Sequence, residues 1–153
     1  ISKKEGIKIE TQGRVENKEH NVSGYWDLMI EQEGKKTLYE VKSKHSKSFW
    51  WMDKKKEGAS LQHKMQLWMY LWLTGIEEGR IIYLSKDDLA ILEYAIQRSD
   101  KELEKAVMDE INLLNRSWKE KLPPAPPPED DWKSKYCRFH KQCVKQEKYI
   151  SSL

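Results

Sequence analysis

The 153-residue chain lacks the features that mark membrane and secreted proteins. It has no apolar run of about eighteen residues, which excludes a transmembrane helix, and no signal peptide is visible at its start. Cysteine occurs only twice, at Cys137 and Cys143, which is too few for the disulfide framework of a small secreted protein. We therefore expect a protein without a membrane partner, in the cytoplasm or another intracellular setting.

The chain also lacks a large net charge. The net charge is only +3, although charged residues make up 35% of the chain. So small an excess does not by itself imply a nucleic-acid partner, and the distribution of the charges matters more. The length fits a single domain with one core. Because the chain starts at Ile1 rather than Met, we expect a fragment or a processed form.

Hydrophobic periodicity predicts an α/β (α+β) fold. The two predicted helices cover residues 59–74, where Leu61, Met65, Trp68 and Trp72 would face the core, and 99–122, opened by a capping box at Ser99. Strands are predicted over residues 7–15, 22–31, 37–43, 80–84 and 90–95, the second and third joined as a hairpin by a turn at residues 33–35. This order indicates a central mixed β-sheet flanked by helices. We expect a core over residues 1–122, a proline-rich linker over 123–131 and a small appendage over 132–153.

Ionisable side chains occupy two of the predicted strands where a plain strand would carry apolar ones. Asp27 lies in Gly24-Tyr25-Trp26-Asp27, and Glu40 and Lys42 lie two apart in the next strand, so they share one face. If the strands pair, two carboxylates and one ammonium meet. Carboxylates at that range repel one another unless a cation lies between them, and such oxygen ligands suit Mg²⁺ or Mn²⁺. A lysine there can orient a water and stabilise an anionic transition state.

A polar stripe on the first predicted helix supplies a second wall for this site. His63, Gln66 and Tyr70 lie at positions i, i+3 and i+7, so they share one stripe of the helix, offset from its apolar face. A solvated stripe and an edge strand with an exposed Glu40–Lys42 face are the structural alternatives.

Three short motifs occur in a fixed order: Gly-x-x-Asp at Asp27, Glu-x-Lys at Glu40 and Lys42, and Gln-x-x-x-Tyr at Gln66 and Tyr70. Together they resemble the pattern of the PD-(D/E)XK nuclease superfamily. The branch that it resembles is the RecB-like one, with the CRISPR-associated RecB-like exonucleases and related phage nucleases. The resemblance implies a restriction-endonuclease-like core and a metal-dependent DNA nuclease. It implies metal ligands at Asp27, Glu40 and the carbonyl oxygen of Val41, a water-positioning role for Lys42, and site-lining roles for Gln66 and Tyr70. His63 is a further candidate metal ligand.

The chain departs from that family's pattern in two places. Family members usually carry another acid or a histidine on an N-terminal helix. The sequence predicts no helix before Ile7, so either that helix lies outside this sequence or the site is built without it. Glu5, Glu10, Glu16 and Glu19 are candidates by residue type only. The C-terminal segment around Cys137 and Cys143 resembles the iron–sulfur segment of some members, but a serine stands at its first cysteine position. A [4Fe–4S] cluster generally takes four thiolates. We therefore expect no intact cluster. The segment either is a degenerate remnant that packs without metal or forms one Cys137–Cys143 contact.

A basic and aromatic run follows Lys42 directly. Its lysines could neutralise phosphates, and its tryptophans could stack on bases at roughly 1–3 kcal/mol per base; a solvated loop whose tryptophans cover the core is the alternative. The candidate DNA-binding residues are Lys44, Lys47, Trp50, Lys54, Lys55 and Lys56.

We accordingly expect a Mg²⁺- or Mn²⁺-dependent deoxyribonuclease that hydrolyses phosphodiester bonds of DNA as a RecB-like exonuclease, in the cytoplasm, the nucleoid or, for a viral protein, the host cell. The alternative is a non-catalytic nucleic-acid-binding module derived from such a nuclease. The sequence leaves open a protein partner or homo-oligomer. It also leaves open the pathway, with DNA repair, recombination, phage replication and CRISPR adaptation as choices.

Overall fold

The computed structural model describes residues 6–55, 58–125 and 136–141. The chain divides into two compact units, Ile1–Val107 and Met108–Leu153. Three residues named above, Glu5, Lys56 and Cys143, lie outside the described residues, as does most of the predicted linker and appendage. Among the described helices, none is long and apolar enough to cross a membrane.

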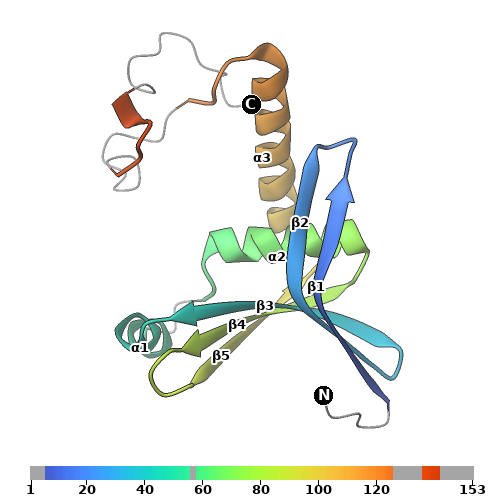
Figure 1. The fold of residues 1–153 in the computed structure, drawn as a ribbon, viewed down its shortest axis with the longest axis vertical. Helices are drawn as coiled ribbons and strands as arrows, with labels where there is room; N and C mark the ends of the chain where they lie inside the picture. Colours follow the sequence, from blue (N-terminus) through green and yellow to red (C-terminus); the bar gives the residue numbers. More distant parts are fainter. Residues whose placement is uncertain (1–5, 56–57, 126–135, 142–153) are drawn as a thin grey trace. The chain divides into compact units, whose positions relative to one another are not determined.

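A five-stranded mixed sheet forms the centre of the first unit (Figure 1). Its strands lie in chain order, and only β3 and β4 are parallel neighbours. The segment between them holds both α1 and α2, as a parallel crossover requires. The predicted fold class, a mixed sheet with flanking helices, is confirmed. The strands are β1 (Ile7–Asn17), β2 (Val22–Gln32), β3 (Lys35–Lys44), β4 (Glu78–Ser85) and β5 (Ile91–Gln97).

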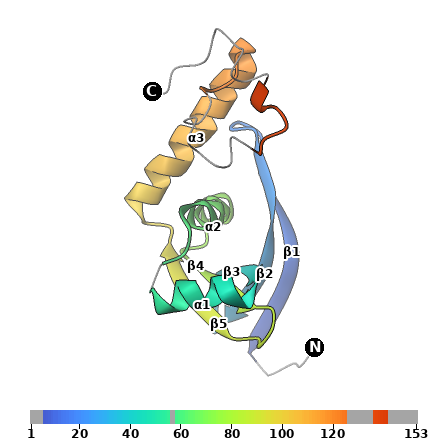
Figure 2. The same cartoon turned by 90° about the vertical axis from the view of Figure 1, so that its left-hand side faces the viewer.

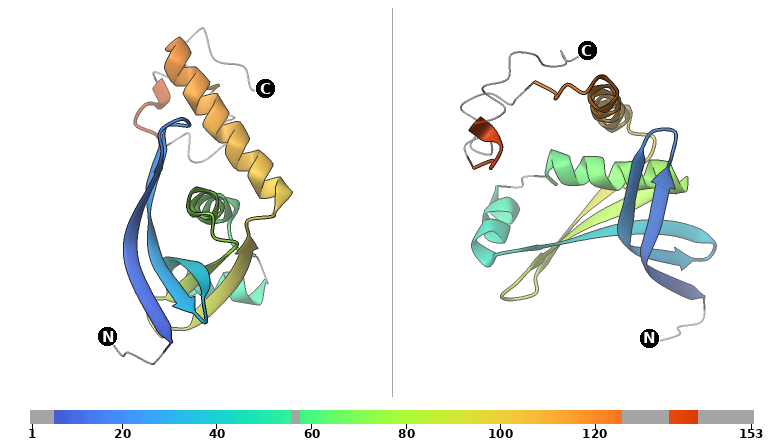
Figure 3. Two further views of the ribbon diagram at one scale, coloured as in Figure 1. Left: turned by 90° about the vertical axis from the view of Figure 1, so that its right-hand side faces the viewer. Right: turned by 45° about the horizontal axis from the view of Figure 1, so that its top comes forward.

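The β1–β2 hairpin extends beyond the rest of the sheet and curls past α2. Figure 2 and the left view of Figure 3 show α2 end-on with the curved hairpin beside it. The ring of His20, next to the hairpin turn, lies 5.3 Å from the ring of Trp72 on α2. On β2 the buried residues are Trp26 and Met29, three positions apart, so the face that this strand buries changes close to Asp27. Tyr25, on the same face of the strand as Met29, is 60% exposed.

Helix α2 (Leu61–Thr74) lies across the sheet and contacts strands throughout it (Figure 1). The Ser60 side chain accepts a hydrogen bond from the His63 amide at its start, and Gly75, in the left-handed conformation, ends it. The predicted core face was wrong in part, because Leu61 is 60% exposed. The buried residues of this helix are Leu67, Trp68, Tyr70 and Leu71.

Helix α1 (Ser46–Lys54) occupies the basic and aromatic run, which the sequence did not predict to be helical. The His45 side chain accepts from the Lys47 amide as its N-terminal cap. Phe49 and Met52 are buried, whereas Trp50 and Trp51 are 48% and 45% exposed. The run is thus a helix rather than the solvated loop of the alternative interpretation, and about half of each tryptophan is in solvent.

Helix α3 (Lys101–Glu120) begins in the first unit and continues into the second. Its cap is Asp100 rather than Ser99, because the Asp100 carboxylate accepts from the amides of Glu102 and Leu103, each at 3.1 Å. Leu103 and Val107 are buried.

Candidate active site

Asp27 and Glu40 come from neighbouring antiparallel strands. The register pairs Leu28 with Tyr39 and Met29 with Leu38, so Asp27 and Glu40 stand at the next opposed position and on the same face. The β2–β3 ladder ends at the Leu28–Tyr39 pair. Just beyond that end, the Asp27 carboxylate accepts a hydrogen bond of 2.8 Å from the Val41 amide. The Asp27 side chain thus takes over a backbone donor that the ladder leaves unpaired, which fixes the carboxylate beside Glu40.

Glu40 is a buried acid whose partners do not satisfy it fully. Glu40 is 2% exposed, and its Oε1 lies 2.5 Å from the Nζ of Lys42. Its Oε2 is buried and has no hydrogen-bond partner among the described residues. A buried polar atom without a partner is costly, and in native proteins it is commonly explained by an ordered water, a bound ion or a catalytic role. The unpaired oxygen of Glu40, next to Asp27, is therefore the feature of this site that fits a bound cation.

Burial raises the pKa of Glu40 above its ordinary value. The hydrogen bond and positive charge of Lys42 act in the opposite direction, and the negative charge of Asp27 adds to the increase. Lys42 alone therefore does not offset the desolvation of this carboxylate. A divalent cation between Asp27 and Glu40 would favour the ionised form of both groups.

Tyr70 of α2 packs directly against the strand that carries Asp27. A Cβ placed on Gly24 would lie 2.7 Å from Cε1 of Tyr70, so only glycine fits under the ring. The Gln66 amide donates to the Tyr70 hydroxyl at 3.2 Å. Tyr70 is only 5% exposed, so the prediction that its stripe is offset from the buried face was wrong at this residue. The glycine of Gly-x-x-Asp and the tyrosine of Gln-x-x-x-Tyr are thus two sides of one contact.

His63 reaches the sheet through Tyr83, a residue that the sequence analysis did not single out. Its Nδ1 and the Tyr83 hydroxyl are hydrogen-bonded at 2.7 Å, and the Ser60 amide donates to the same hydroxyl at 3.2 Å. Tyr83 is fully buried and stands beside Lys42 in the parallel β3–β4 register. Burial, followed by the positive charges of Lys42 and Lys44, lowers the pKa of His63. The sequence carried no clear signal for Tyr83, because it lies in the continuous apolar run 81–84, in which periodicity does not show which face a residue takes.

Known proteins are similar to this chain over most of its length. The CRISPR-associated exonuclease Cas4 of Saccharolobus solfataricus is 28% identical over 130 residues, which cover 84% of this chain and 55% of that protein. The chain thus spans about half the length of this curated relative. The solved structure of SSO0001 is 25% identical, with a TM-score of 0.54, and the match covers 88% of this chain and 59% of that chain. The resemblance to RecB-like PD-(D/E)XK nucleases is confirmed.

A second solved structure supports the fold alone. The alkaline exonuclease of Laribacter hongkongensis is 16% identical with a TM-score of 0.53, and the match covers 75% of this chain and 62% of that chain. A scan against protein-family models finds no match.

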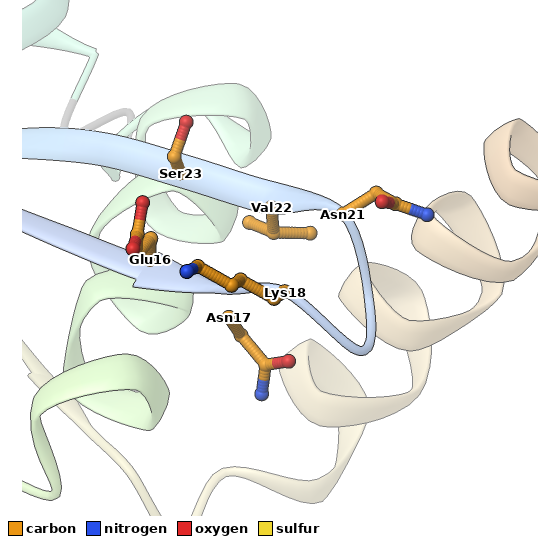
Figure 4. Close-up of a pocket in the computed structure, with 6 residues that line it drawn as sticks. All are labelled: Glu16, Asn17, Lys18, Asn21, Val22 and Ser23. Atoms are coloured by element: carbon orange, nitrogen blue, oxygen red, sulfur yellow. The ribbon is translucent and has the colours of Figure 1, made fainter.

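The additional acid of RecB-like nucleases has no counterpart beside Asp27 and Glu40 in the part of the chain that the structure describes. No group of three histidine, cysteine or acidic side chains there could hold a metal. Glu10 pairs with Lys8 at 2.6 Å. Glu16 lies near the tip of the β1–β2 hairpin, in a hollow formed with Asn17, Lys18, Asn21, Val22 and Ser23 (Figure 4).

Glu16 is too far along the hairpin to serve this site. It pairs in register with Ser23, four residues from Asp27, which is roughly 13 Å along a strand. Its carboxylate accepts from Arg14 at 2.9 Å, and Glu19 is exposed near the turn. None of the described acids among these candidates, Glu10, Glu16 and Glu19, is therefore placed as a third ligand beside Asp27 and Glu40.

The iron–sulfur prediction stays untested, because Cys143 lies outside the described residues. Cys137 is exposed and belongs to the second unit.

Proposed function

We propose that the chain is a divalent-metal-dependent deoxyribonuclease of the RecB-like exonuclease type, with Mg²⁺ or Mn²⁺ as the metal. The observation that supports this most is the buried, unpaired Oε2 of Glu40, opposite Asp27 and next to the Lys42 ammonium. Two carboxylates suffice for Mg²⁺, which usually keeps several waters and takes one or two carboxylates together with substrate phosphate oxygens. The similarity to Cas4, a protein named as an exonuclease, agrees with this assignment.

In this proposal Asp27 and Glu40 would hold the metal, with the Val41 carbonyl oxygen as a further ligand. A bound divalent ion lowers the pKa of a coordinated water and neutralises charge on the scissile phosphate. Lys42, whose side chain is 27% exposed, would orient the attacking water and stabilise negative charge on the phosphate in the transition state. Gln66 and Tyr70 would shape the wall that faces Asp27.

His63 would act in its neutral form. Its lowered pKa keeps the ring uncharged near neutral pH, and the Tyr83 hydroxyl fixes its orientation through Nδ1. A neutral imidazole held in this way presents its other nitrogen, Nε2, either as a metal ligand or as a hydrogen-bond donor to a phosphate oxygen.

The basic residues next to the site would bind the DNA. Lys44 lies on β3 with its Nζ 5.0 Å from the centre of the Tyr83 ring. Helix α1 carries Lys47, Trp50 and Lys54, and Lys55 is its C-terminal cap. The proposed contacts are Lys44, Lys47, Trp50, Lys54, Lys55 and Lys56, of which Lys56 lies outside the described residues.

A cleavage assay tests this proposal. End-labelled linear DNA, circular DNA and single strands would be incubated with Mg²⁺ and with Mn²⁺, with a chelator control. We expect metal-dependent cleavage by the wild-type chain, and we expect Asp27→Ala and Lys42→Ala to lower its rate by at least about 100-fold, the scale on which loss of one transition-state contact is measured. Full activity in either variant, with an unchanged circular dichroism spectrum, would refute the assignment.

The alternative function is a non-catalytic nucleic-acid-binding module. The absence of a third acid beside Asp27 and Glu40 among the described residues is the observation that favours it. Such a module would bind DNA without metal and would leave all three substrates intact.

A further inference from the structure

The hydroxyl of Tyr83 is a buried polar group with two hydrogen bonds. The Ser60 amide donates to its oxygen at 3.2 Å, and its other partner is Nδ1 of His63, at 2.7 Å. Tyr83 itself is fully buried in β4. Among the described residues, these two contacts are therefore all that is available to the oxygen and the proton of the phenol.

A count of donors and acceptors gives the direction of each hydrogen bond. A backbone amide can only donate, so the Tyr83 oxygen accepts from Ser60. The phenol has one proton of its own, and the acceptor left for it among the described residues is the lone pair of His63 Nδ1. A proton on Nδ1 would instead leave the Tyr83 proton buried without an acceptor, which is costly. Nδ1 of His63 is therefore the acceptor, and the neutral ring carries its proton on Nε2.

We infer that Tyr83 is a positioning residue that holds His63 as the Nε2–H tautomer, so that His63 donates a hydrogen bond to an anionic oxygen and does not bind the metal. A metal ion needs the lone pair of an imidazole nitrogen, and in this tautomer the Tyr83 proton already occupies the only one. We take the anionic oxygen to belong to a DNA phosphate, so the inference rests on the proposed nuclease function. Of the two roles open to Nε2, only the donor role remains.

Cationic side chains surround the rings of His63 and Tyr83. The two ring centres lie 5.5 Å apart, and the Nζ of Lys44 lies 5.0 Å from the centre of the Tyr83 ring. In the parallel register Tyr83 stands opposite Lys42, whereas Glu40 lies two residues earlier, roughly 7 Å along the strand. After burial, the groups that lower the pKa of His63 are the ammonium groups of Lys42 and Lys44. The ring thus lies on the basic side of the site.

The two carboxylates of the site do not include His63 in a metal-binding group. In the part of the chain that the structure describes, no three histidine, cysteine or acidic side chains could hold a metal, so His63 does not complete a set with Asp27 and Glu40. A neutral N–H donor close to two ammonium groups suits a phosphate oxygen, because all three groups stabilise the same negative charge.

NMR of the ¹⁵N-labelled chain, in chelator and without DNA, tests the tautomer directly. Long-range ¹H–¹⁵N spectra distinguish a protonated from an unprotonated ring nitrogen by its chemical shift. At pH 7.5 we expect His63 to show an unprotonated Nδ1 and a protonated Nε2. His45 is an internal reference, because its Nδ1 accepts from the Lys47 amide and is therefore unprotonated. A His63 ring with its proton on Nδ1 would overturn the inference.

Tyr83→Phe keeps the buried ring and removes the proton that holds Nδ1 of His63. We expect both tautomers of His63 to be populated in this variant. Tyr94→Phe is the matched control, because its ring lies 5.9 Å from that of Tyr83 and its hydroxyl is not a partner of His63. It should leave the His63 spectrum unchanged. A His63 spectrum identical to that of the wild type in a folded Tyr83→Phe variant would show that Tyr83 does not position the ring.

Calorimetry separates a donor from a metal ligand without any change at Tyr83. His63→Ala should keep its Mn²⁺ affinity within about 2-fold of the wild type, yet lower kcat/KM for DNA cleavage by about 10- to 150-fold, the range for a hydrogen bond to a charged group. A loss of Mn²⁺ affinity as large as that of Asp27→Asn would make His63 a ligand and overturn the inference.

A double-mutant cycle tests whether Tyr83 acts through His63. Tyr83→Phe should lower kcat/KM in the wild-type background, but change it by less than about 2-fold once His63 is replaced by alanine. Additive losses would contradict a positioning role. Failure of the nuclease assignment would appear instead as intact DNA with the wild-type chain, while the NMR spectrum still showed the Nε2–H tautomer of His63.

Discussion

At the scale of single residues, the candidate site is built around a destabilising group. Glu40 is buried, one of its oxygens has no partner among the described residues, and its pKa is raised. Active sites commonly retain such groups because the cost to stability is offset by a gain in function. The same carboxylate that weakens the metal-free fold is the one that a cation would satisfy.

Glu40→Gln should therefore stabilise the metal-free protein while removing a metal ligand. Because the pKa of Glu40 in the folded state lies above its value of 4.5 in the unfolded chain, ionised Glu40 destabilises the fold at neutral pH. That cost is relieved as the pH falls through the folded-state pKa. We expect Glu40→Gln to raise Tm at pH 7.5 by about 2–4 °C for each kcal/mol recovered, and the difference from wild type should shrink on acidification.

The exposed Glu19→Gln is the control for that thermal measurement and should leave Tm unchanged. A lower Tm for Glu40→Gln in chelator at pH 7.5 would show that the Lys42 ion pair outweighs the desolvation of Glu40.

His63 should titrate below its ordinary pKa of 6.5. Burial and the charges of Lys42 and Lys44 disfavour the protonated ring, so the unfolded chain binds the proton more tightly. The stability that the neutral ring contributes is therefore lost as the pH falls below 6.5. Histidine NMR titration, with His63→Gln for assignment, should place the midpoint below 6.5, and Lys44→Gln should raise it.

For this titration the distant Lys36→Gln should leave the midpoint in place. A wild-type midpoint at or above 6.5 would contradict the burial of the His63 ring against Tyr83.

At the scale of secondary-structure elements, close packing joins the motifs into one site. The hydrogen bond from Val41 to Asp27 joins β2 and β3 where their ladder ends, and Gly24 lets Tyr70 of α2 settle on β2. The spacing of the motifs was readable in the sequence because it follows strand and helix periods. The packing of Tyr70 on Gly24 could not be predicted from the sequence, because it depends on how far the β1–β2 hairpin curls around α2.

Local sequence patterns did not predict helix α1. It has a histidine cap instead of Ser, Thr, Asp or Asn, no acid in its first turn, and aromatic residues on both its buried and exposed sides. Apolar periodicity therefore does not separate Phe49 and Met52, which are buried, from Trp50 and Trp51, which are exposed. The contact with the sheet decides which residues are buried.

Gly24→Ala tests the contact between β2 and α2. The added methyl group would overlap the Tyr70 ring, and overpacking of this kind typically costs about 1–3 kcal/mol. We expect a lower Tm together with reduced cleavage, because the ring and the Gln66 hydrogen bond must shift. Thermal denaturation and the cleavage assay would measure the two effects.

Gly58→Ala is the matched control, since a Cβ there would meet only the Lys64 Nζ, at 3.9 Å. If Gly24→Ala kept both wild-type stability and wild-type cleavage, the close packing of Tyr70 on β2 would be wrong.

At the scale of the whole molecule, a small net charge conceals a local concentration of positive charge. The chain carries only +3, yet lysines cluster in and around α1, next to the end of the strand that holds Glu40 and Lys42. Composition alone gave no basis for a nucleic-acid partner. The order of motifs along the chain predicted the resemblance to RecB-like nucleases and the fold class. The position of Tyr83 and the exposure of the tryptophans depended on tertiary packing.

The most direct test of the account is a calorimetric titration of the wild-type chain, Asp27→Asn and Glu40→Gln with Mn²⁺. We expect the wild-type chain to bind the ion at millimolar concentration or below, and each variant to lose that binding, because both carboxylates are ligands. Absence of binding by the wild-type chain at millimolar Mn²⁺, or equal binding by all three proteins, would contradict the metal site formed by Asp27 and Glu40. The first of these results would favour the non-catalytic DNA-binding module.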